Sequence, residues 1–582
     1  MKNLLTLKKY FLRYRKKLLW GIIFILISNA GTVYLPILLK DSINELQKNT
    51  TSEKLLEYAI LIVGTSVIAG VFRYLIRQTI IVVSREIEYD LRGDFWNHIQ
   101  KLPLRYFQNN STGNIMSHAT NDINAVRMFI GPAVMYSIDT SIRLIIVVSI
   151  MLSLNFSLTI YSLLPLPILS YGVYRVGKLI HEKYTKIQEN FSQLTTRAQE
   201  NFSGIRVIKS YVRESNEIKR WNELSKEYLR KNMNLVRLQA LIMPILYIIT
   251  GISIIVVIWL GGTKVINGEM NLGEIAAFVM YLGILIWPVI AFGWVMNIVQ
   301  QGEASMKRLN KIFNEPYEIQ DSKLTDNSIG EIKGQIEFNN VSFRYSDSLP
   351  EVFKNISLKI PVGSTLAIVG HTGSGKTSLI NLISRLYDVS SGEILIDGKN
   401  IKQIPLDILR TNVAQVQQES FLFSDSVYGN ISYGLREIDK QKVEEVSRIA
   451  NFDKDVQSFP KGYETIVGER GITFSGGQKQ RASLARALAT NPKILILDDS
   501  FSAVDTHTEE EILKNLRQFM KERTSIIISH RISTVKDADM IIILDNGKIA
   551  EQGTHEQLVA KGGIYADLYY KQLLEKELEE LN

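Results

Sequence analysis

The chain has 582 residues, of which 46% are hydrophobic and only 22% are charged. A single hydrophobic core does not grow to this size, so at least two domains are expected. Its 25 Tyr and 22 Phe exclude a disordered chain, and the absence of Cys excludes disulfide-stabilised secreted scaffolds, thiolate nucleophiles and Cys-ligated metal centres. The net charge of +8 predicts a negatively charged partner, for which nucleic acid and the anionic inner leaflet of a membrane both qualify.

The first 17 residues are basic and amphipathic. They contain no acidic residue and seven basic ones, which are Lys2, Lys8, Lys9, Arg13, Arg15, Lys16 and Lys17. Apolar residues three or four apart, at Leu4, Leu7, Phe11 and Tyr14, place a stripe on one helix face. We therefore expect an interfacial helix along the inner leaflet and a cytoplasmic N-terminus. A cleaved signal peptide is the competing interpretation, but the apolar run that follows is too long for one.

Long uncharged runs dominate the first half of the chain, at 18–39, 58–72, 144–174, 238–263 and 275–302. A spanning helix needs about 20 apolar residues, so most of these runs can cross a bilayer, and the longest one, with its polar break at 155–157, is predicted to hold two spans. The predicted spans are about 18–40, 58–82, 128–153, 157–178, 240–263 and 275–300. Buried helices of a soluble protein are the alternative, but the longest runs exceed ordinary core helices. An even number of spans returns the C-terminus to the cytoplasm.

Two long polar helical stretches, 84–127 and 179–237, separate the second span from the third and the fourth from the fifth. Both are predicted to be cytoplasmic, where about 20 further helical residues project roughly 30 Å beyond the membrane. Such extensions can carry force to a cytosolic domain. The loops on the other face are short, which leaves no extracellular domain.

The composition changes near residue 310. We expect a transmembrane domain at 1–310, a polar linker at 311–335, and at 336–582 an α/β domain in which short β-rich runs alternate with helical ones. The predicted fold is therefore a polytopic α-helical membrane domain, with six spans and long cytoplasmic extensions, fused to an α/β P-loop ATPase domain.

A phosphate-binding motif opens this second domain. The buried strand 365–369 leads directly into GHTGSGKT at 370–377, and a helical pattern follows. This is the P-loop pattern in its required strand–loop–helix context. Backbone N–H groups wrap a polyphosphate at the helix N-terminus, Lys376 neutralises phosphate oxygens, and the Thr377 hydroxyl is a ligand for Mg²⁺. A second carboxylate for the metal is Asp498, which ends the apolar strand 494–497.

Further motifs make the resemblance specific. FSGGQ at 474–478, Asp505, His530, Gln418, Tyr345 and Gly468-Glu469-Arg470-Gly471 resemble, in order and spacing, the ATP-binding cassette (ABC) family. In the apolar half, Tyr106-Phe107 with Gly113 and Asp122, and Gln199-Glu200-Asn201 with Gly204-Ile205 and Ile208-Lys209, resemble the two intracellular coupling loops of type IV ABC exporters. The resemblance covers essentially the whole chain and implies a half-transporter.

The resemblance also implies roles for single residues. Tyr345 would stack on adenine, and Ser475 and Gly477 would reach the γ-phosphate of a nucleotide bound to the other subunit, so dimerisation is part of the chemistry. The implied cofactors are ATP and Mg²⁺. The nucleotide-binding set is Tyr345, Gly370, Thr372, Gly373, Ser374, Gly375, Lys376, Thr377, Ser378, Ser475, Gly476, Gly477, Gln478 and Asp505; the Mg²⁺ set is Thr377, Gln418 and Asp498; and the catalytic set is Asp499, His530 and Gln418.

Position 499 departs from the family pattern. In active members, the aspartate that corresponds to Asp498, called the Walker B aspartate, is followed by Glu, which orients or activates the attacking water. This chain has Asp499 at that position. The shorter carboxylate retreats by roughly 1.5 Å, and displacements near 1 Å can cost about 100-fold in rate. We expect slow hydrolysis at this site and a heterodimer in which the intact FSGGQ completes the partner's site. A slow homodimer stays open, because His530 is retained and Asp can substitute for Glu in positioning water.

The substrate is less well indicated. Asp139 and Arg143 are four residues apart, so they either neutralise each other or belong to a substrate site. Arg73 and Arg77 either favour an anionic or amphipathic substrate or extend to the membrane edge by snorkelling. Aromatic and amide residues of the last span either pack or line a cavity; they are Tyr281, Trp287, Phe292, Trp294, Met296, Asn297 and Gln300.

The expected function is ATP-driven export of hydrophobic or amphipathic compounds by alternating access, from a bacterial inner or plasma membrane with both termini cytoplasmic. The expected partners are a second ABC half-transporter, membrane lipids and the substrate. Nucleic acid is not expected, because the N-terminal basic residues account for much of the charge. A lipid flippase and an importer of the same fold are the alternatives.

Overall fold

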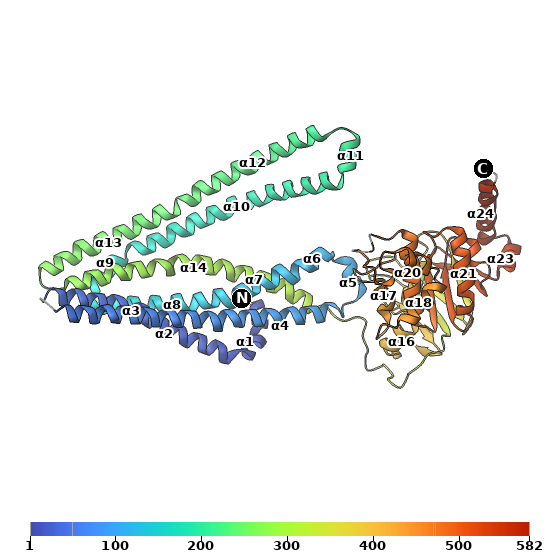
Figure 1. The fold of residues 1–582 in the computed structure, drawn as a ribbon, viewed down its shortest axis with the longest axis horizontal. Coiled ribbons are helices and arrows are strands. Elements are labelled where there is room, and N and C mark those ends of the chain that lie inside the picture. Colours follow the sequence, from blue (N-terminus) through green and yellow to red (C-terminus); the bar gives the residue numbers. More distant parts are fainter. Residues whose placement is uncertain (1, 49–50, 469–470, 472, 581–582) are drawn as a thin grey trace. The chain divides into compact units, whose positions relative to one another are not determined.

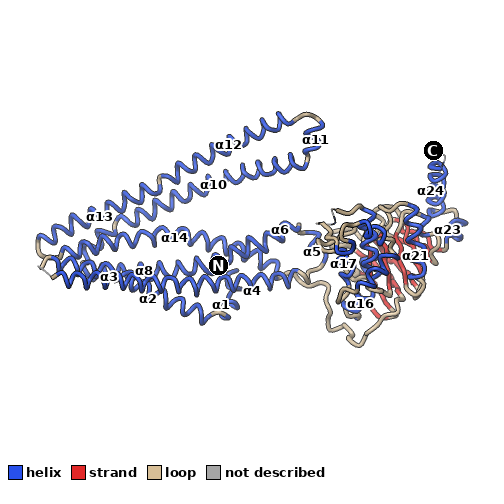
Figure 2. The backbone as a smooth tube through the Cα atoms, viewed as in Figure 1, coloured by secondary structure: helices blue, strands red, loops and turns tan. Residues whose placement is uncertain are grey.

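The computed structural model describes residues 2–48, 51–468, 471 and 473–580. It divides into two compact units, one of Met1–His98 with Thr112–Glu315 and one of Ile99–Ser111 with Pro316–Asn582. Among the described residues, strands occur only in the second unit, and the first is built of helices (Figure 2).

The helical unit contains long helices joined by short turns, several of which continue one another through single π-helical turns (Figure 1). Its elements are η1 (Lys2–Leu7), α1 (Lys8–Arg13), α2 (Arg15–Leu46), α3 (Ser52–Ile76), η2 (Arg77–Ile81), α4 (Val82–Ile99), α6 (Thr112–Ser117), η3 (His118–Asp122), α7 (Ile123–Met128), η4 (Phe129–Ala133), α8 (Val134–Leu154), α9 (Phe156–Leu163), α10 (Pro165–Ser203), α11 (Ile205–Ser210), α12 (Glu214–Ala240), α13 (Ile242–Ile266) and α14 (Leu272–Phe313).

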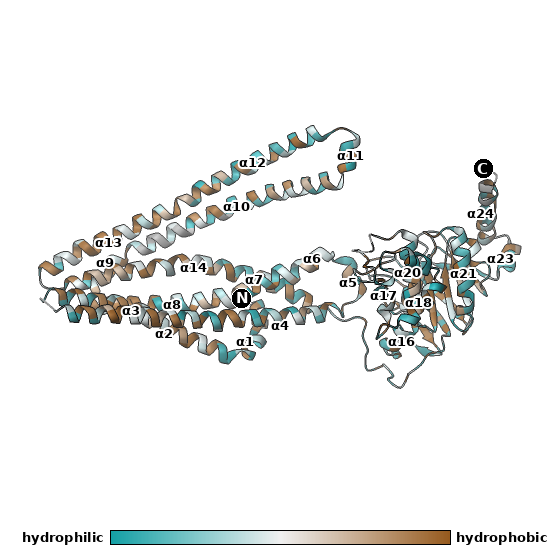
Figure 3. Ribbon diagram, viewed as in Figure 1, coloured by the Kyte–Doolittle hydropathy of each residue, from teal (hydrophilic) through white to brown (hydrophobic). Residues whose placement is uncertain are grey.

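Among the described residues, five helices are long and apolar enough to cross a membrane: Arg15–Leu46, Ser52–Ile99, Thr112–Leu154, Glu214–Ile266 and Leu272–Phe313. Figure 3, coloured by residue hydropathy, shows hydrophobic residues along α2, α3, α13 and α14. In the predicted fourth span, 157–178, α9 and α10 meet at Leu164, whose backbone stays helical with φ −54° and ψ −36° and whose N–H donates to the Ile160 carbonyl oxygen at 3.1 Å. Pro165 and Pro167 have no N–H to donate, which explains why the helical hydrogen-bond pattern is interrupted there. A six-span count therefore depends on α9 and the first part of α10 crossing together.

The N-terminal segment differs from its prediction. Of the apolar stripe that we expected to face lipid, Leu7 is 0% exposed and Leu4, Phe11 and Tyr14 are half-buried, and Tyr10, outside the predicted stripe, is buried as well. Three of the seven basic residues also have carboxylate partners on α4: Lys9 pairs with Asp94 at 2.8 Å, Arg13 with Asp90 and Lys17 with Glu86. Three of the seven basic residues are therefore opposed by acidic residues that are distant in the sequence.

The helices α10 and α12 lie side by side and are joined at one end by the short helix α11 (Figure 1). Large apolar side chains are exposed around this tip; they are Phe202, Ile205, Val207, Tyr211 and Val212. The Gln199–Lys209 motif of the second predicted coupling loop thus occupies an exposed helical turn.

The second unit holds two sheets. A four-stranded antiparallel sheet has the order β2-β1-β4-β5, and a six-stranded sheet has the order β10-β9-β3-β8-β7-β6, in which all neighbours are parallel except β10 and β9. The strands are β1 (Ile336–Phe343), β2 (Phe353–Ile360), β3 (Thr365–Val369), β4 (Ser391–Ile396), β5 (Lys399–Asn400), β6 (Val413–Val416), β7 (Ile494–Asp498), β8 (Thr524–Ile528), β9 (Met540–Asp545) and β10 (Lys548–Gly553).

The parallel strands are buried on both faces, as their continuous apolar sequences predict. Successive side chains alternate between two cores: Leu495 and Leu497 pack with the helical layer, and Ile494 and Ile496 pack toward the antiparallel sheet. The helices of this unit are α5 (Leu104–Asn109), α15 (Lys376–Ile383), η5 (Ile401–Gln403), α16 (Leu406–Asn412), α17 (Val427–Ile431), η6 (Ser432–Gly434), α18 (Lys440–Ile449), α19 (Asp453–Ser458), η7 (Gly462–Glu464), α20 (Gly476–Ala489), α21 (Thr506–Met520), α22 (Ile532–Val535), α23 (His555–Lys561) and α24 (Ile564–Glu580).

The short helix α5 belongs to this second unit although its sequence interrupts the first. It carries the Tyr106-Phe107 motif of the first predicted coupling loop. Arg105 pairs with Glu318 at 3.3 Å. A groove is lined by α5 and the segment before it, together with residues of 317–321, α16 and Leu386. The Tyr106-Phe107 part of the first predicted coupling loop therefore packs on the α/β unit.

Candidate functional site

The order of the strands brings the predicted site residues to one edge of the six-stranded sheet. The neighbours β3, β8, β7 and β6 are parallel, so their carboxyl ends meet at the same edge. The P-loop follows β3, His530 follows β8, Asp498 and Asp499 end β7, and Gln418 follows β6. Ligands of open α/β sheets bind at this edge.

The P-loop is shaped to receive an anion. Gly375 precedes α15 with φ +98°, and a Cβ there would lie 2.9 Å from Val352 Cγ1, so the position needs glycine. Lys376, 7% exposed, donates from Nζ to the carbonyl oxygens of Gly370 at 2.8 Å and His371 at 2.9 Å. The Ser374 hydroxyl oxygen is buried and has no hydrogen-bond partner. A buried ammonium held only by neutral carbonyls, beside an unpaired hydroxyl at a helix N-terminus, fits a polyphosphate.

Asp498 lies beside the P-loop. It is 3% exposed, and its Oδ2 accepts a hydrogen bond of 2.9 Å from the Thr377 hydroxyl. Burial raises the pKa of Asp498, and the hydrogen bond from Thr377 opposes that increase. Burial lowers the pKa of Lys376, and the charges of Asp498 and Asp499 oppose that decrease. A hydroxyl and a carboxylate at hydrogen-bond distance are a donor set that suits Mg²⁺ accompanied by phosphate oxygens.

Asp499 stands in a left-handed backbone conformation, with φ +46°. Among non-glycine residues, Asn and Asp tolerate this conformation best, so the shorter acid suits the backbone of this turn. The Asp499 N–H donates to the carbonyl oxygen of Ile528 at 2.9 Å. Its Oδ2 lies 3.4 Å from Nε2 of Gln418. The carboxylate therefore faces the predicted Mg²⁺ ligand.

The FSGGQ motif starts α20. Ser475 caps this helix by accepting from the Gln478 N–H, while Gln478 Oε1 accepts from the Ser475 N–H at 3.0 Å. Gln478 also donates to Asp455 at 3.1 Å, and Asp455 pairs with Arg481 at 2.8 Å. Gln478 therefore has a structural role in shaping the helix start, in addition to its predicted place in the nucleotide-binding set.

Gln480, which lies outside the predicted site residues, joins this helix to the segment of Asp505. Gln480 Oε1 accepts from the Ala503 N–H and its Nε2 donates to the Ser502 hydroxyl, both at 3.0 Å. A Cβ on Gly477 would lie 3.0 Å from the Ala503 oxygen, so glycine permits this close approach. Asp505 in turn caps α21 by accepting from the Thr508 N–H at 2.9 Å. The only sequence signal for Gln480 was its place two residues beyond the motif.

The other predicted residues divide as follows. Tyr345 is half-buried, bonds to Ser378 through its hydroxyl at 2.7 Å, and packs edge-on against Tyr387. Glu469 and Arg470 lie outside the described residues. Gly370, Thr372 and Gly373 lie in the P-loop, and Gly476 lies beside Ala503. Among the described residues, no hydrogen bond or ion pair joins the FSGGQ motif to the P-loop or to Asp498.

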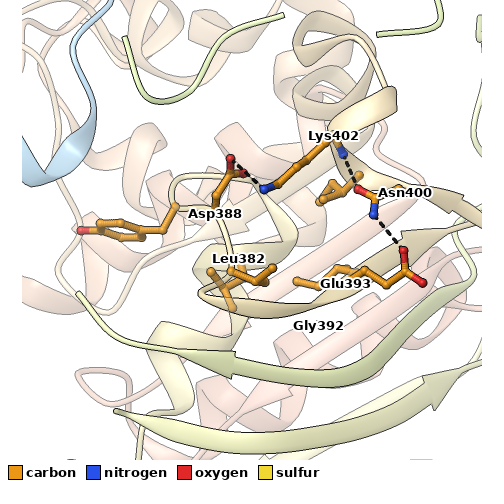
Figure 4. A pocket seen from close by; sticks show the side chains of 10 residues that line it. Leu382, Asp388, Gly392, Glu393, Asn400 and Lys402 are labelled. Atoms are coloured by element: carbon orange, nitrogen blue, oxygen red, sulfur yellow. Dashed lines mark hydrogen bonds and ion pairs between the residues drawn. The ribbon is translucent and has the colours of Figure 1, made fainter. Parts of the chain in front are cut away.

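A small pocket lies elsewhere in the second unit (Figure 4). Lys402 pairs with Asp388 at 3.4 Å, and Asn400 donates to Glu393 at 3.0 Å. None of the predicted nucleotide-site residues lines this pocket. Its polar groups satisfy one another, so we do not assign it to the nucleotide site.

In the helical unit, Asp139 and Arg143 form a neutralising pair at 3.0 Å. Asn29 joins them, because it donates to Asp139 at 2.9 Å and accepts from Arg143 at 2.9 Å. These groups therefore satisfy one another and favour a structural role. Arg73 and Arg77 are exposed, and Arg73 reaches the Thr32 hydroxyl at 3.4 Å.

Comparison with known proteins shows the family. Residues 18–289 match the ABC transporter transmembrane region and residues 353–502 match the ABC transporter family. The probable multidrug resistance ABC transporter ATP-binding/permease protein YheI of Bacillus subtilis is 36% identical over 571 residues, which cover 97% of this chain and 96% of that protein. This chain belongs to the type IV ABC exporter family.

One further relative and one solved structure are similar to almost the whole chain. The ATP-dependent lipid A-core flippase of Syntrophus aciditrophicus is 35% identical, over 95% of this chain and 92% of that protein. A solved structure of a bacterial Atm1-family ABC exporter with ATP bound is 27% identical, with a TM-score of 0.79 over 96% of this chain and 98% of that one. The half-transporter is thus a multi-pass membrane protein that binds ATP with Mg²⁺ and hydrolyses it to drive transport, and ABC exporters act as dimers.

Proposed function

We propose that this half-transporter exports hydrophobic or amphipathic compounds as one half of a heterodimer, and that its own Walker site hydrolyses ATP slowly. Asp499 carries the proposal. Its carboxylate is one methylene shorter than that of Glu, and a displacement near 1 Å can cost about 100-fold in rate. The intact FSGGQ motif would complete the partner's site.

Thr377, Gln418 and Asp498 would hold Mg²⁺, which neutralises charge on the phosphate oxygens when bound. Lys376 and the P-loop N–H groups bind and orient the phosphates. Asp499 orients water next to Gln418, and His530 holds the γ-phosphate from the neighbouring strand end. The water oxygen bonds to the γ-phosphorus, the bond to the β-bridging oxygen breaks, and ADP and phosphate leave.

Coupling to transport would run through the two intracellular loops. ATP draws two ATPase domains together, and the motion passes through α5 and α11 into the spans, so that an inward-open cavity becomes outward-open. The exposed apolar side chains around α11 support this proposal, because they need a partner and the other half-transporter would supply it. Both termini would lie in the cytoplasm.

An aromatic cluster supports an apolar substrate. Tyr136 of α8 lies edge-on to Trp287 and Trp294 of α14, with ring centroids 6.3 and 5.3 Å apart. The two tryptophans remain 47% and 43% exposed. Aromatic faces of this kind contact hydrophobic and cationic amphipathic compounds.

The test is ATPase turnover of the purified chain before and after Asp499→Glu. We expect turnover to rise about 100-fold in the variant, because the added methylene returns the carboxylate to the water. His530→Ala in the same background is the control and should abolish the gain. Brisk turnover of the unmodified chain that changes little in Asp499→Glu would contradict the slow site.

A homodimer with ordinary activity is the second candidate. The 3.4 Å contact between Asp499 and Gln418 favours it, because the shorter carboxylate already reaches the neighbouring site residue. The similarity to a lipid A-core flippase gives this candidate a lipid substrate.

A further inference from the structure

The loop that carries His530 is held by a residue from the last helix of the chain. Gln572 of α24 accepts a hydrogen bond from the Ile532 N–H through Oε1 at 2.8 Å. It donates from Nε2 to the carbonyl oxygen of His530 at 2.6 Å. One side-chain amide therefore bonds to the backbone on both sides of Arg531.

The helix that supplies Gln572 is itself fixed to the ATPase fold. The Glu551 carboxylate accepts from the N–H groups of Ile564 and Tyr565, at 2.8 and 3.1 Å, which satisfies donors at the start of α24. Tyr565 is 0% exposed, and its hydroxyl bonds to His555 Nδ1 at 2.7 Å. Gln572 is therefore presented from an anchored helix.

A second anchor holds the same loop from α21. The buried Glu509 bonds to Arg531 and accepts from the Thr534 hydroxyl. The Ser529 hydroxyl accepts from the Arg531 N–H at 3.0 Å. Each of these contacts holds the side chain of Arg531 or the residues around it, whereas Gln572 alone among the described residues bonds to the His530 carbonyl.

The chemistry of the contact is selective. It needs a donor toward the His530 carbonyl and an acceptor toward the Ile532 N–H, and a carboxamide supplies both. A carboxylate would keep the acceptor and repel the carbonyl, and an alanine would supply neither group. The imidazole of His530 is itself exposed, so its position depends on its backbone.

We propose that Gln572 is a positioning residue for His530. From the C-terminal helix α24 it fixes the backbone of the loop His530–Ile532, and this backbone sets the position of the imidazole at the γ-phosphate. The proposal rests on the proposed role of His530. It ties the hydrolytic site to a helix 42 residues further along the chain.

The experiment measures kcat and KM for ATP in the full-length chain, in the wild type and in the Asp499→Glu background. We expect Gln572→Ala and Gln572→Glu to lower kcat about tenfold, because displacements below 1 Å already cost activity. KM for ATP should stay within about twofold, since the P-loop contacts are unchanged. Lys571→Ala, which removes only an exposed pair with Asp567, is the matched control and should leave kcat unchanged.

Two measurements separate positioning from a merely structural role. Leu568→Ala loosens the packing of α24 and should lower Tm, whereas Gln572→Ala should leave Tm unchanged. In a His530→Ala background, Gln572→Ala should cost nothing further, because the residue that it positions is absent. An equal further loss there, or a kcat loss that only follows Tm, would overturn the proposal.

The same experiment distinguishes the two levels of inference. Unchanged turnover in His530→Ala would show that the proposed role of His530 is wrong. A fall of turnover in His530→Ala to a measurable residual rate, with unchanged kcat in Gln572→Ala, would leave that role intact and overturn the inference about Gln572.

Discussion

The nucleotide site contains a buried ammonium and a buried carboxylate that do not bond to each other. Lys376 donates to P-loop carbonyls, and Asp498 accepts from Thr377. Burial shifts both pKa values toward the neutral form, downward for Lys376 and upward for Asp498. Each charge is therefore stabilised less than it would be in water, and a nucleotide with its metal supplies what is missing.

Asp498→Asn should separate stability from activity. A carboxylate with a raised folded-state pKa contributes stability at pH below its unfolded pKa and loses it as pH rises through the folded-state value. Without nucleotide, the ATPase domain of the variant should therefore unfold at a higher Tm than that of the wild type at pH 8. This difference in Tm should shrink toward acidic pH. Hydrolysis should fall at least about 100-fold, because the variant lacks the charge that we propose binds Mg²⁺.

Thermal unfolding between pH 5 and pH 8, with ATPase assays at each pH, checks this prediction. The exposed Asp347 offers a control, since Asp347→Asn should change neither the Tm difference nor turnover. A lower Tm for Asp498→Asn at pH 8 would mean that the protein already compensates the charge.

At the scale of elements, three contacts one helical turn apart fasten the N-terminal segment to α4. Glu86, Asp90 and Asp94 are spaced by four, and they meet Lys17, Arg13 and Lys9 in reverse order. Two tyrosines reinforce these contacts, because Tyr10 donates to Asp94 at 2.6 Å and Tyr14 donates to Asp90 at 3.0 Å. The carboxylates that the N-terminal segment needs come from a helix that lies 69 to 85 residues later in the chain.

The three ion pairs form a ladder between the N-terminal segment and α4. Neutralising its carboxylates with Glu86→Gln, Asp90→Asn and Asp94→Asn together should release the N-terminal segment without unfolding the protein. Each exposed pair contributes at most about 1 kcal/mol, so trypsin should cleave after Arg13 and Lys17 about tenfold faster while Tm changes little. The matched control is Lys9→Arg with Arg13→Lys and Lys17→Arg, which keeps every charge and every cleavage site. Equal cleavage in both triple variants would contradict the ladder.

The features that the sequence predicts carry a local signal, whereas the contacts that it misses join residues that are distant along the chain. The P-loop, Asp498 and His530 each follow a recognisable strand, and the parallel order of those strands brings them together. The contacts of α1 with α4 and of Gln572 with His530 join residues that no local pattern relates. The interruption of the hydrogen-bond pattern at Leu164 depends on prolines inside an apolar run, and hydropathy alone does not register it.

At the scale of the whole molecule, the proposed mechanism gives one chain two half-sites. The P-loop with Asp498 would form one, and Ser475 on the capped start of α20 would form the other. No hydrogen bond or ion pair of the described residues joins them. This separation supports sites that are shared between two half-transporters, in which a heterodimer and a homodimer make different predictions for variants of the two halves.

In a heterodimer with a slow site on this chain, Ser475→Asp should lower turnover about 100-fold and Lys376→Ala only a few-fold. Asp caps a helix as well as Ser does, so the variant keeps α20 intact while placing a negative charge toward the partner's γ-phosphate. Ser475→Asn, which keeps the cap without the charge, is the matched control and should retain most activity. The measurement is ATPase turnover of the complex purified from its native host through a tag on this chain. Equal losses in Lys376→Ala and Ser475→Asp would instead identify two equivalent sites. In a homodimer every site contains one Lys376 and one Ser475, so either single variant alters both sites.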